Sequence, residues 1–247
     1  MTLPEFSNQF DVLVASYRRF KDFDNRELLD SIEFNEYEKS LYLTKAQEEV
    51  VLSLYTGRNS SGDSFEETEE LRRYLSNLIM EEQLEPIVTT NGKPLGIDSK
   101  SKFFTLPEDL WFITYESVLL SNPKCEGAST MEVVPVTQDE YHRIRKNPFR
   151  GANDRRALRL DLSEGNVEIV CKYDVSQYYV RYLKKLNPIV LEDMPNDLTI
   201  DGVDKATSCE VHPSLHQRIL EMAVQEALRD KLMGNASSTT AERQERN

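Results

Sequence analysis

Glycine, cysteine and histidine are scarce in this chain. The first two shortages each exclude a class of functional site, and the third limits the bases available to a catalytic set that is assembled in space. Nine glycines in 247 residues form no glycine-rich phosphate loop of the Walker or dinucleotide-binding kind, and neither a nucleophile elbow nor a zinc-protease motif occurs. Cys125, Cys171 and Cys209 are too few and too widely spaced for a disulfide framework or a paired zinc module. With three histidines as the available imidazole bases, no catalytic set is recognisable from the sequence.

Long apolar runs and a basic leader are also missing. The absence of a run of about 18 apolar residues predicts no membrane span, and the N-terminus lacks the charge and apolar pattern of a signal peptide. Lysine and arginine number 30 against 43 acids, a formal charge of −13, which argues against nucleic-acid or acidic-lipid binding by the whole surface. A chain of this length can bury its own core. The composition therefore predicts an acidic, soluble protein of a reducing compartment.

Both ends of the chain have the pattern of helices, with apolar residues recurring three, four and seven positions apart. Asn35 followed by Glu38 matches a capping box, and Pro213 and Gly234 stand where a helix begins and ends. We predict helices over Glu5–Phe20, Asn35–Tyr55, Ser64–Leu84 and Pro213–Leu232.

The middle of the chain has the texture of a β region. From Pro86 onward, prolines and glycines separate short runs rich in β-branched and aromatic residues, with one predicted helix, Gln138–Lys146, among them. Within one run, leucines alternate with Arg159 and Asp161, which predicts that these two share a polar face. The predicted strands are Lys102–Leu106, Leu110–Leu120, Met131–Val136, Ala157–Leu162, Val167–Tyr173 and Tyr178–Leu183.

Together these elements predict an α+β fold: a helical bundle formed by the N-terminal helices and a C-terminal helix, with an inserted, mainly antiparallel β region. The bundle is expected to be a discontinuous domain of residues 1–85 and 205–233, and the insertion to span residues 86–204. Residues 234–247 carry no large apolar side chain, so we expect a flexible C-terminal tail.

Charge is distributed unevenly along the chain. Residues 143–159 carry seven basic side chains against one acid, a net +6, whereas residues 63–85 carry eight acids against two arginines, a net −6. Such a chain can contact a copy of itself head to tail. Two solvated faces, or a basic loop on DNA phosphates, explain the same pattern. The candidate interface residues are Arg143, Arg145, Lys146, Arg150, Arg155, Arg156 and Arg159, with Glu66, Glu67, Glu69 and Glu70 on the other side. Phe149, within the basic segment, either anchors a partner or folds back onto the core.

A small metal site is the alternative to an interface. Cys209, His212 and His216 have a spacing that zinc accepts, although Glu210 is the only further ligand nearby. The simpler interpretation is that His212 caps the helix starting at Pro213, while His216 packs or forms a hydrogen bond one turn later. A cytosolic α+β protein with metal bound at the cysteine and the two histidines is therefore a second hypothesis.

Short segments spread from about Leu3 to Leu232 carry a resemblance. They are Glu5–Leu13, Asn35–Ser40, Leu43–Glu49, Leu106–Leu110, Pro135–Val136, Asp139–Tyr141, Asn147–Arg150, Tyr182–Lys185, Pro188–Leu191 and Cys209–His216. None of them is catalytic. In this order they resemble virion structural proteins of crAss-like and related Bacteroides phages.

The resemblance implies a neck or tail ring protein, similar to the tail-tubular adaptors that form a twelvefold ring beneath the portal of short-tailed phages. It implies a non-enzymatic virion component without cofactor or metal, assembled in the bacterial host cytoplasm. The implied partners are copies of itself in a ring, the portal protein and other neck or tail ring proteins, with genomic DNA passing nonspecifically through the bore and no membrane contact. The acidic balance agrees, because an acidic bore repels phosphates and lets DNA slide.

Overall fold

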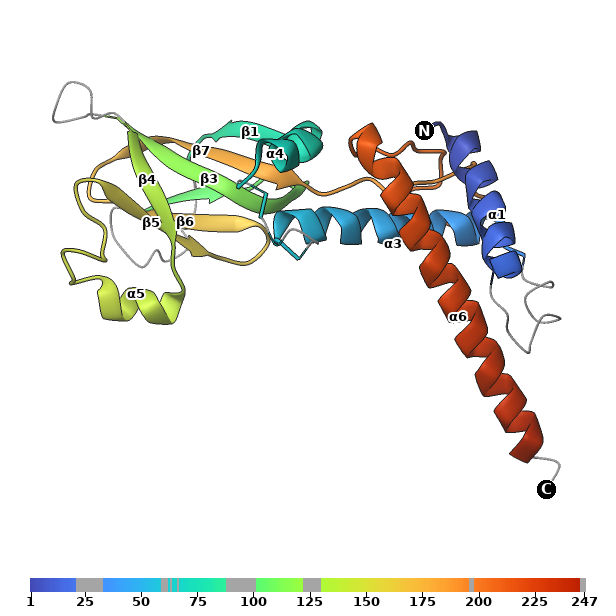
Figure 1. The fold of residues 1–247 in the computed structure, drawn as a ribbon. Helices are drawn as coiled ribbons and strands as arrows, with labels where there is room; N and C mark the ends of the chain where they lie inside the picture. Colours follow the sequence, from blue (N-terminus) through green and yellow to red (C-terminus); the bar gives the residue numbers. More distant parts are fainter. Residues whose placement is uncertain are drawn as a thin grey trace. The chain divides into compact units, whose positions relative to one another are not determined.

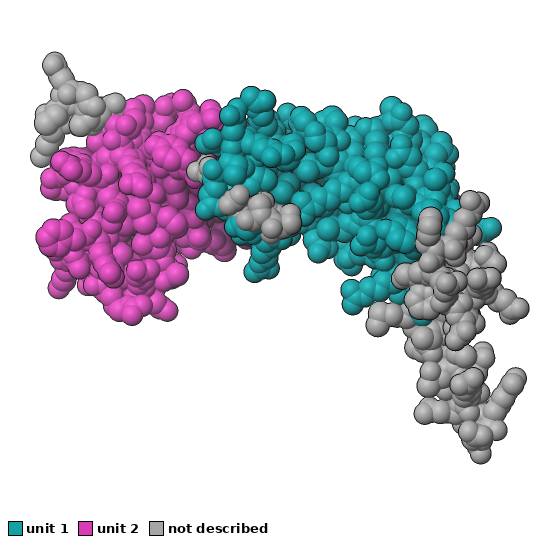
Figure 2. Space-filling model, viewed as in Figure 1, with its two compact units in different colours: residues 1–78, 186–247 teal, residues 79–185 magenta. Residues whose placement is uncertain are grey.

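The computed structural model describes residues 1–20, 33–58, 62, 64–65, 67–87, 101–121, 130–195 and 198–244. The chain forms two compact units (Figure 2): unit 1 is Met1–Leu78 with Leu186–Asn247, and unit 2 is Ile79–Lys185. The described residues of unit 1 are mainly helical, and those of unit 2 build a seven-stranded sheet. The fold is therefore mixed α+β, as the sequence predicts.

In unit 1, three long helices contact one another (Figure 1): α1 (Leu3–Phe20), α3 (Glu36–Tyr55) and α6 (His216–Gln244). Phe6, Leu43 and Ile219, one from each helix, are fully buried, so the helices share an apolar core. The short elements of this unit are α4 (Glu69–Leu75), η1 (Ser76–Leu78) and η2 (Pro213–Leu215). The first two predicted helices are confirmed. The finer description of a helical bundle stays a prediction.

Helix α3 begins as its sequence predicts and also holds the chain that returns from unit 2. The Asn35 side chain accepts from the Glu38 N–H at 2.7 Å, and the Glu38 carboxylate accepts from the Asn35 N–H at 3.1 Å, so the capping box is confirmed. Further along the helix, Ser40 accepts from the N–H of Leu191 and Thr44 from the N–H of Ile189, both at 3.0 Å. These two buried hydroxyls accept hydrogen bonds from backbone N–H groups of the returning extended segment, in place of the acceptors that a neighbouring strand would provide.

In unit 2, one sheet with the strand order β1-β7-β3-β4-β5-β6-β2 carries the fold. All neighbours are antiparallel except β4 and β5, which are parallel because helix α5 connects them. The strands are β1 (Ile79–Leu84), β2 (Lys102–Thr105), β3 (Leu110–Leu120), β4 (Thr130–Pro135), β5 (Arg156–Asp161), β6 (Asn166–Val170) and β7 (Val175–Lys184), with α5 at Gln138–Ile144.

The sheet of unit 2 is buried on two sides. Phe104, Val118 and Tyr178 belong to the main apolar core. On the other side of β5 and β6, Tyr141 and Ile144 of α5 pack in a second cluster, whose strand residues are Leu158, Leu160 and Val170. The N–H of Ile87, just after β1, donates to the carbonyl of Phe103 in β2 at 2.8 Å, which links the two ends of the strand order. All six strands predicted from the sequence are present in this sheet, one with the predicted bounds, Leu110–Leu120, and five with shifted ends.

Two predicted helices differ from the structure. The predicted helix Ser64–Leu84 is wrong over most of its length, because α4 ends at Leu75 and Ile79–Leu84 is a strand paired with β7. The predicted end of the last helix at Leu232 is also wrong, since α6 continues through Gly234 to Gln244. The division into compact units does not test whether either part folds by itself, so the domain bounds 1–85, 86–204 and 205–233 and the flexible tail 234–247 stay predictions.

Candidate subunit interface

The basic segment, residues 143–159, includes the loop between α5 and β5, whose conformation is fixed by local hydrogen bonds. Helix α5 is capped by Thr137, whose hydroxyl accepts from the N–H of Glu140 at 3.3 Å. After the helix, the Asn147 side chain accepts from the backbone N–H groups of Phe149 at 2.9 Å and Arg150 at 3.3 Å. An asparagine that bonds two following N–H groups fixes a tight turn locally. The sequence Asn-Pro-Phe-Arg therefore encodes the bend itself.

Two more features of this loop restrict its conformation. Gly151 donates its N–H to the carbonyl of Asn147 at 2.8 Å, and a Cβ atom at Gly151 would lie 2.8 Å from that oxygen and 2.9 Å from the carbonyl oxygen of Ile144. Glycine is needed there because the backbone passes too closely for a side chain. At the far end, the Asn153 side chain accepts from the N–H of Arg155 at 2.9 Å. The loop is braced at both ends.

Phe149 lies at the tip of this loop and is 85% exposed, which is the largest exposed fraction among the exposed large apolar residues of the described ranges. It does not fold back onto the core, so that alternative is wrong, and partner anchoring by Phe149 stays a prediction. Arg156 is half-buried and donates to the Phe149 carbonyl at 3.3 Å, which holds the tip. The exposed cations of the segment are Arg143, Arg145, Lys146, Arg150 and Arg155. The loop thus presents an aromatic ring within a basic surface.

Arg159 has a different environment from the other basic residues. It is 9% exposed and contacts Glu116 and Asp161, each at 2.9 Å, while the Tyr178 hydroxyl donates to the second oxygen of Glu116 at 2.5 Å. Burial raises the pKa of Glu116, against the opposing effects of Arg159 and Tyr178. Arg159 and Asp161 share one polar face of β5, as the sequence predicts, but at Arg159 this face is buried and the guanidinium belongs to an internal network.

The acidic candidates do not form one helical surface. Glu66 lies outside the described residues, and the exposed Glu67, Glu69 and Glu70 lie at or before α4 in unit 1. Glu67 accepts from the N–H of Ser64, Glu69 pairs with Arg73 at 2.8 Å and Glu70 accepts from the Tyr74 hydroxyl. Of the other four acids of this stretch, Asp63 lies outside the described residues, Glu81 and Glu82 are on β1 in unit 2, and Glu85 directly follows that strand. The pairing of these acids with the basic segment stays a prediction.

The residues of the proposed metal site have other contacts. His212 accepts from the N–H of Ser214 at 3.3 Å as a helix cap, which confirms the simpler interpretation. The ring of His216 lies 5.3 Å from that of Phe6, and its Nε2 is 2.9 Å from the Val211 carbonyl. Burial raises the pKa of the Cys209 thiol to about 11, which favours the protonated form, a poor metal ligand. Within the described ranges, no group of three or more His, Cys, Asp or Glu side chains is placed to hold a metal ion.

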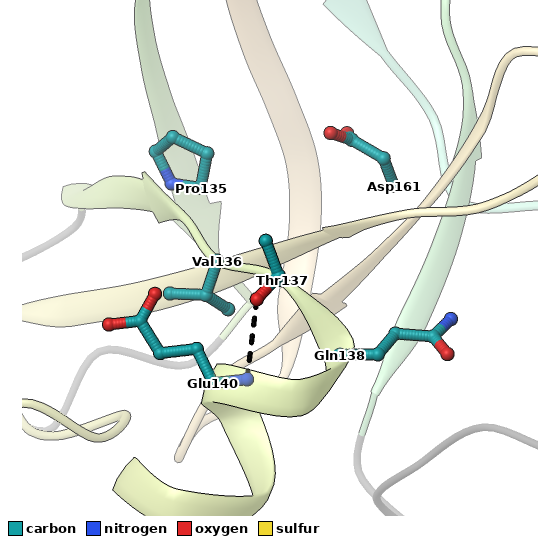
Figure 3. A pocket seen from close by; sticks show the side chains of 6 residues that line it. All are labelled: Pro135, Val136, Thr137, Gln138, Glu140 and Asp161. Atoms are coloured by element: carbon teal, nitrogen blue, oxygen red, sulfur yellow. Dashed lines mark hydrogen bonds between the residues drawn. The ribbon is translucent and has the colours of Figure 1, made fainter.

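A pocket of about 370 Å³ lies where β4 turns into α5 (Figure 3). Its walls are partly apolar, from Pro135 and Val136, and partly polar, from Thr137, Gln138, Glu140 and Asp161. Asp161 is 67% exposed and uses one oxygen for Arg159. The pocket was not predicted from the sequence, because it forms only when the end of β4, the start of α5 and the end of β5 come together.

Comparisons with known proteins match nearly the whole chain. The profile of the family described as phage tail ring protein 3/4 matches residues 1–240. Ring protein 3 of Bacteroides phage crAss001 is 43% identical over 240 residues, which cover 95% of this chain and 99% of that protein. Ring protein 4/5 of the same phage is 30% identical over 234 residues, 91% of each chain. None of the helices in the described ranges is both long and apolar enough to cross a bilayer. The chain therefore belongs to the phage tail ring protein 3/4 family and is a crAss-like phage tail or neck ring protein.

Proposed function

We propose that this chain is a non-enzymatic structural component of a tailed-phage head–tail connector. In this proposal, twelve copies form a ring below the portal, and the genome passes through its bore. The match to proteins named ring proteins over residues 1–240 carries the proposal, because it includes both compact units. The helices of unit 1 act as the helical bundle of an adaptor, assembled in the host cytoplasm, and the partners are the portal protein and the other ring proteins.

The charge of the chain suits this role. A net charge of −13 gives a ring that repels DNA phosphates on average, so that DNA slides through the bore without being held. The α5–β5 loop differs from this average because it carries several exposed cations. A closed ring requires two different surfaces of each subunit to meet at every interface. We therefore assign the loop, without the buried Arg159, to the contact with a neighbouring subunit.

DNA contact by the same loop is the second candidate role. The exposed cations of the loop are also suited to nucleic acid, since phosphates pair with them. The two roles differ in what depends on the loop. A subunit contact is required for ring formation, whereas a DNA contact affects only DNA retention or passage.

Electron microscopy of the purified chain, alone and with the portal protein, tests the proposal. The expected result is closed rings whose class averages show twelvefold symmetry, with a matching mass by native mass spectrometry. The portal protein is expected to promote or orient the ring. A chain that stays monomeric at high concentration, with and without the portal, would contradict the proposed function.

A further inference from the structure

We propose that the Phe149 loop of one subunit inserts into the pocket between β4 and α5 of a second copy of this chain. The loop and the pocket are the two halves of one head-to-tail contact. This inference rests on the proposed ring function and names the partner surface that the loop uses. It replaces the acidic segment 63–85 with a different acceptor, one that lies entirely within unit 2.

The placement of the two surfaces is the first argument. The pocket is lined by residues at the start of α5, Thr137, Gln138 and Glu140, whereas the Phe149 loop follows the end of this helix. The pocket and the loop therefore belong to opposite ends of α5, the helix labelled in Figure 1. With 7 residues, α5 is about 10 Å long. A head-to-tail contact requires two different surfaces that face in different directions, because a closed ring repeats the same rotation at every interface. The ends of α5 meet this requirement.

Shape and polarity are the second argument. An apolar cavity of about 150 Å³ already accepts benzene, and this pocket of about 370 Å³ leaves room for a phenyl ring with part of an arginine beside it. Pro135 and Val136 offer the apolar wall for Phe149, and Figure 3 shows the carboxylates of Glu140 and Asp161 on either side of these two residues. Those acids are complementary to the cations of the loop.

The build of the loop is the third argument. The turn is fixed by Asn147 and by the close approach at Gly151, so ordering it on binding costs little entropy. An exposed phenyl ring on a fixed loop has the features of an interface anchor, since aromatic residues buried in a partner pocket dominate binding energies. The surrounding arginines steer the approach and select an acidic partner.

Photo-crosslinking maps the contact directly. The full chain is made with p-benzoylphenylalanine in place of Phe149, mixed as 15N-labelled and unlabelled copies, assembled and irradiated. The expected product joins residue 149 of one copy to the segment 135–140 of another, with the mixed isotope pattern of two chains. A crosslink to Glu67–Arg73 of the neighbour would support the acidic segment instead, and a crosslink to added DNA would support the DNA role. Either result, or no crosslink in assembled rings, overturns the inference.

Variants test the energetic part. Phe149→Ala is expected to weaken subunit association by roughly tenfold or more without loss of the folded circular dichroism spectrum, because the side chain is 85% exposed. Val12→Ala on α1, also an exposed apolar residue at 66%, is the matched control and leaves association unchanged. Arg150→Glu and Glu140→Arg each change association little, because a single exposed charge pair contributes little. The pair Arg150→Glu with Arg155→Glu weakens association measurably, and the addition of Glu140→Arg restores part of the loss.

These experiments test the contact between the Phe149 loop and the pocket separately from the proposed ring function. Wild-type chain that forms no ring contradicts the proposed function. Wild-type rings together with equally abundant Phe149→Ala rings contradict only the pocket contact and leave the ring function standing.

Discussion

At the scale of single residues, Arg159 and Phe149 have the opposite of the burial that is usual for a charged and an apolar side chain. The arginine is buried among Glu116, Asp161 and Tyr178, and the phenylalanine is exposed. A buried charge requires an oppositely charged, hydrogen-bonded partner within the fold. An exposed aromatic ring, in contrast, offers an apolar surface to a neighbouring molecule. We therefore expect a contact made by the basic segment to depend on its loop, and the stability of unit 2 to depend on Arg159.

The first prediction concerns this buried network. Arg159→Met is expected to lower the free energy of unfolding by about 3 kcal/mol, because it leaves the buried Glu116 carboxylate without its cation. The double variant Arg159→Met with Glu116→Leu recovers much of the loss, since no uncompensated charge stays in the sheet. Urea denaturation monitored by circular dichroism measures both variants. Lys172→Met, at the exposed pair with Asp154, is the control and changes stability little. A double variant no better than the single one would contradict the explanation.

The second prediction concerns pH. Burial, together with the Met1 amino group and His212, lowers the pKa of His216 below its ordinary value of 6.5, and the hydrogen bond to Val211 opposes this only in part. Between pH 6.5 and the lower folded-state pKa, His216 is protonated more in the unfolded state than in the folded state. The free energy of unfolding is therefore highest above pH 6.5 and falls as the pH drops toward the folded-state pKa. Unfolding free energies from pH 5 to 7.5 are expected to show this slope. In His216→Gln the slope is expected to be smaller, and equal slopes would contradict the assignment.

At the scale of elements, the sequence predicted best where local signals are complete. The capping box of Asn35 and Glu38 starts α3 where expected, and β3 has the predicted bounds Leu110–Leu120. In contrast, Ile79–Leu84 has no local strand pattern. Its leucine and isoleucine spacing continues that of α4, and only pairing with β7 makes it a strand. Gly234 is a usual helix end, yet α6 continues past it, since one glycine lowers helix stability without breaking the hydrogen-bond ladder.

The candidate site was predictable to a similar extent. The net charge of residues 143–159 and the aromatic residue Phe149 can be read from the sequence, so the sequence predicts this loop as a candidate interface. The burial of Arg159 was not, because the alternation in β5 predicts one polar face, whereas core and α5 cover both sides of this strand. The pocket depends on three segments meeting in space, which no local pattern encodes.

The third prediction concerns the contact between α3 and the returning chain. Ser40→Ala is expected to lower stability by about 1–3 kcal/mol, because the buried N–H of Leu191 loses its acceptor. Ser16→Ala on α1 is the control, since this half-buried hydroxyl only donates to the Leu13 carbonyl of its own helix. Thermal unfolding of both variants provides the comparison. Equal losses would show that the Leu191 contact contributes nothing beyond that of an ordinary helix serine.

The fourth prediction concerns the shared core of unit 1. Leu75 and Ile219 are both fully buried although they are far apart in the sequence. Leu75→Asp and Ile219→Asp are therefore each expected to unfold the same cooperative part of the chain, because an unpaired carboxylate in an apolar core is strongly unfavourable. Hydrogen exchange by mass spectrometry reports which segments lose protection. Loss confined to α4 in one variant and to α6 in the other would contradict a common core.

At the scale of the whole molecule, charge separates a subunit contact from a DNA contact. The basic segment carries a net +6 in a chain of −13, so the rest of any neighbouring copy is acidic. Complementary charge acts mainly on association rate and partner choice, and a single exposed pair contributes only about 0–1 kcal/mol. Assembly should therefore tolerate one charge reversal and fail only when several are combined.

The last prediction follows from this difference. Arg145→Glu, Arg150→Glu and Arg155→Glu change exposed side chains of the loop, so the triple variant should fold normally and each single variant should assemble almost as well as wild type. The triple variant is expected to form few rings, and raising salt should weaken wild-type assembly in the same direction, because exposed charges are screened. Rings counted by electron microscopy at low and high salt measure the effect. Normal ring numbers combined with altered DNA retention would assign the loop to the bore, whereas few rings without any DNA present would assign it to the contact between subunits.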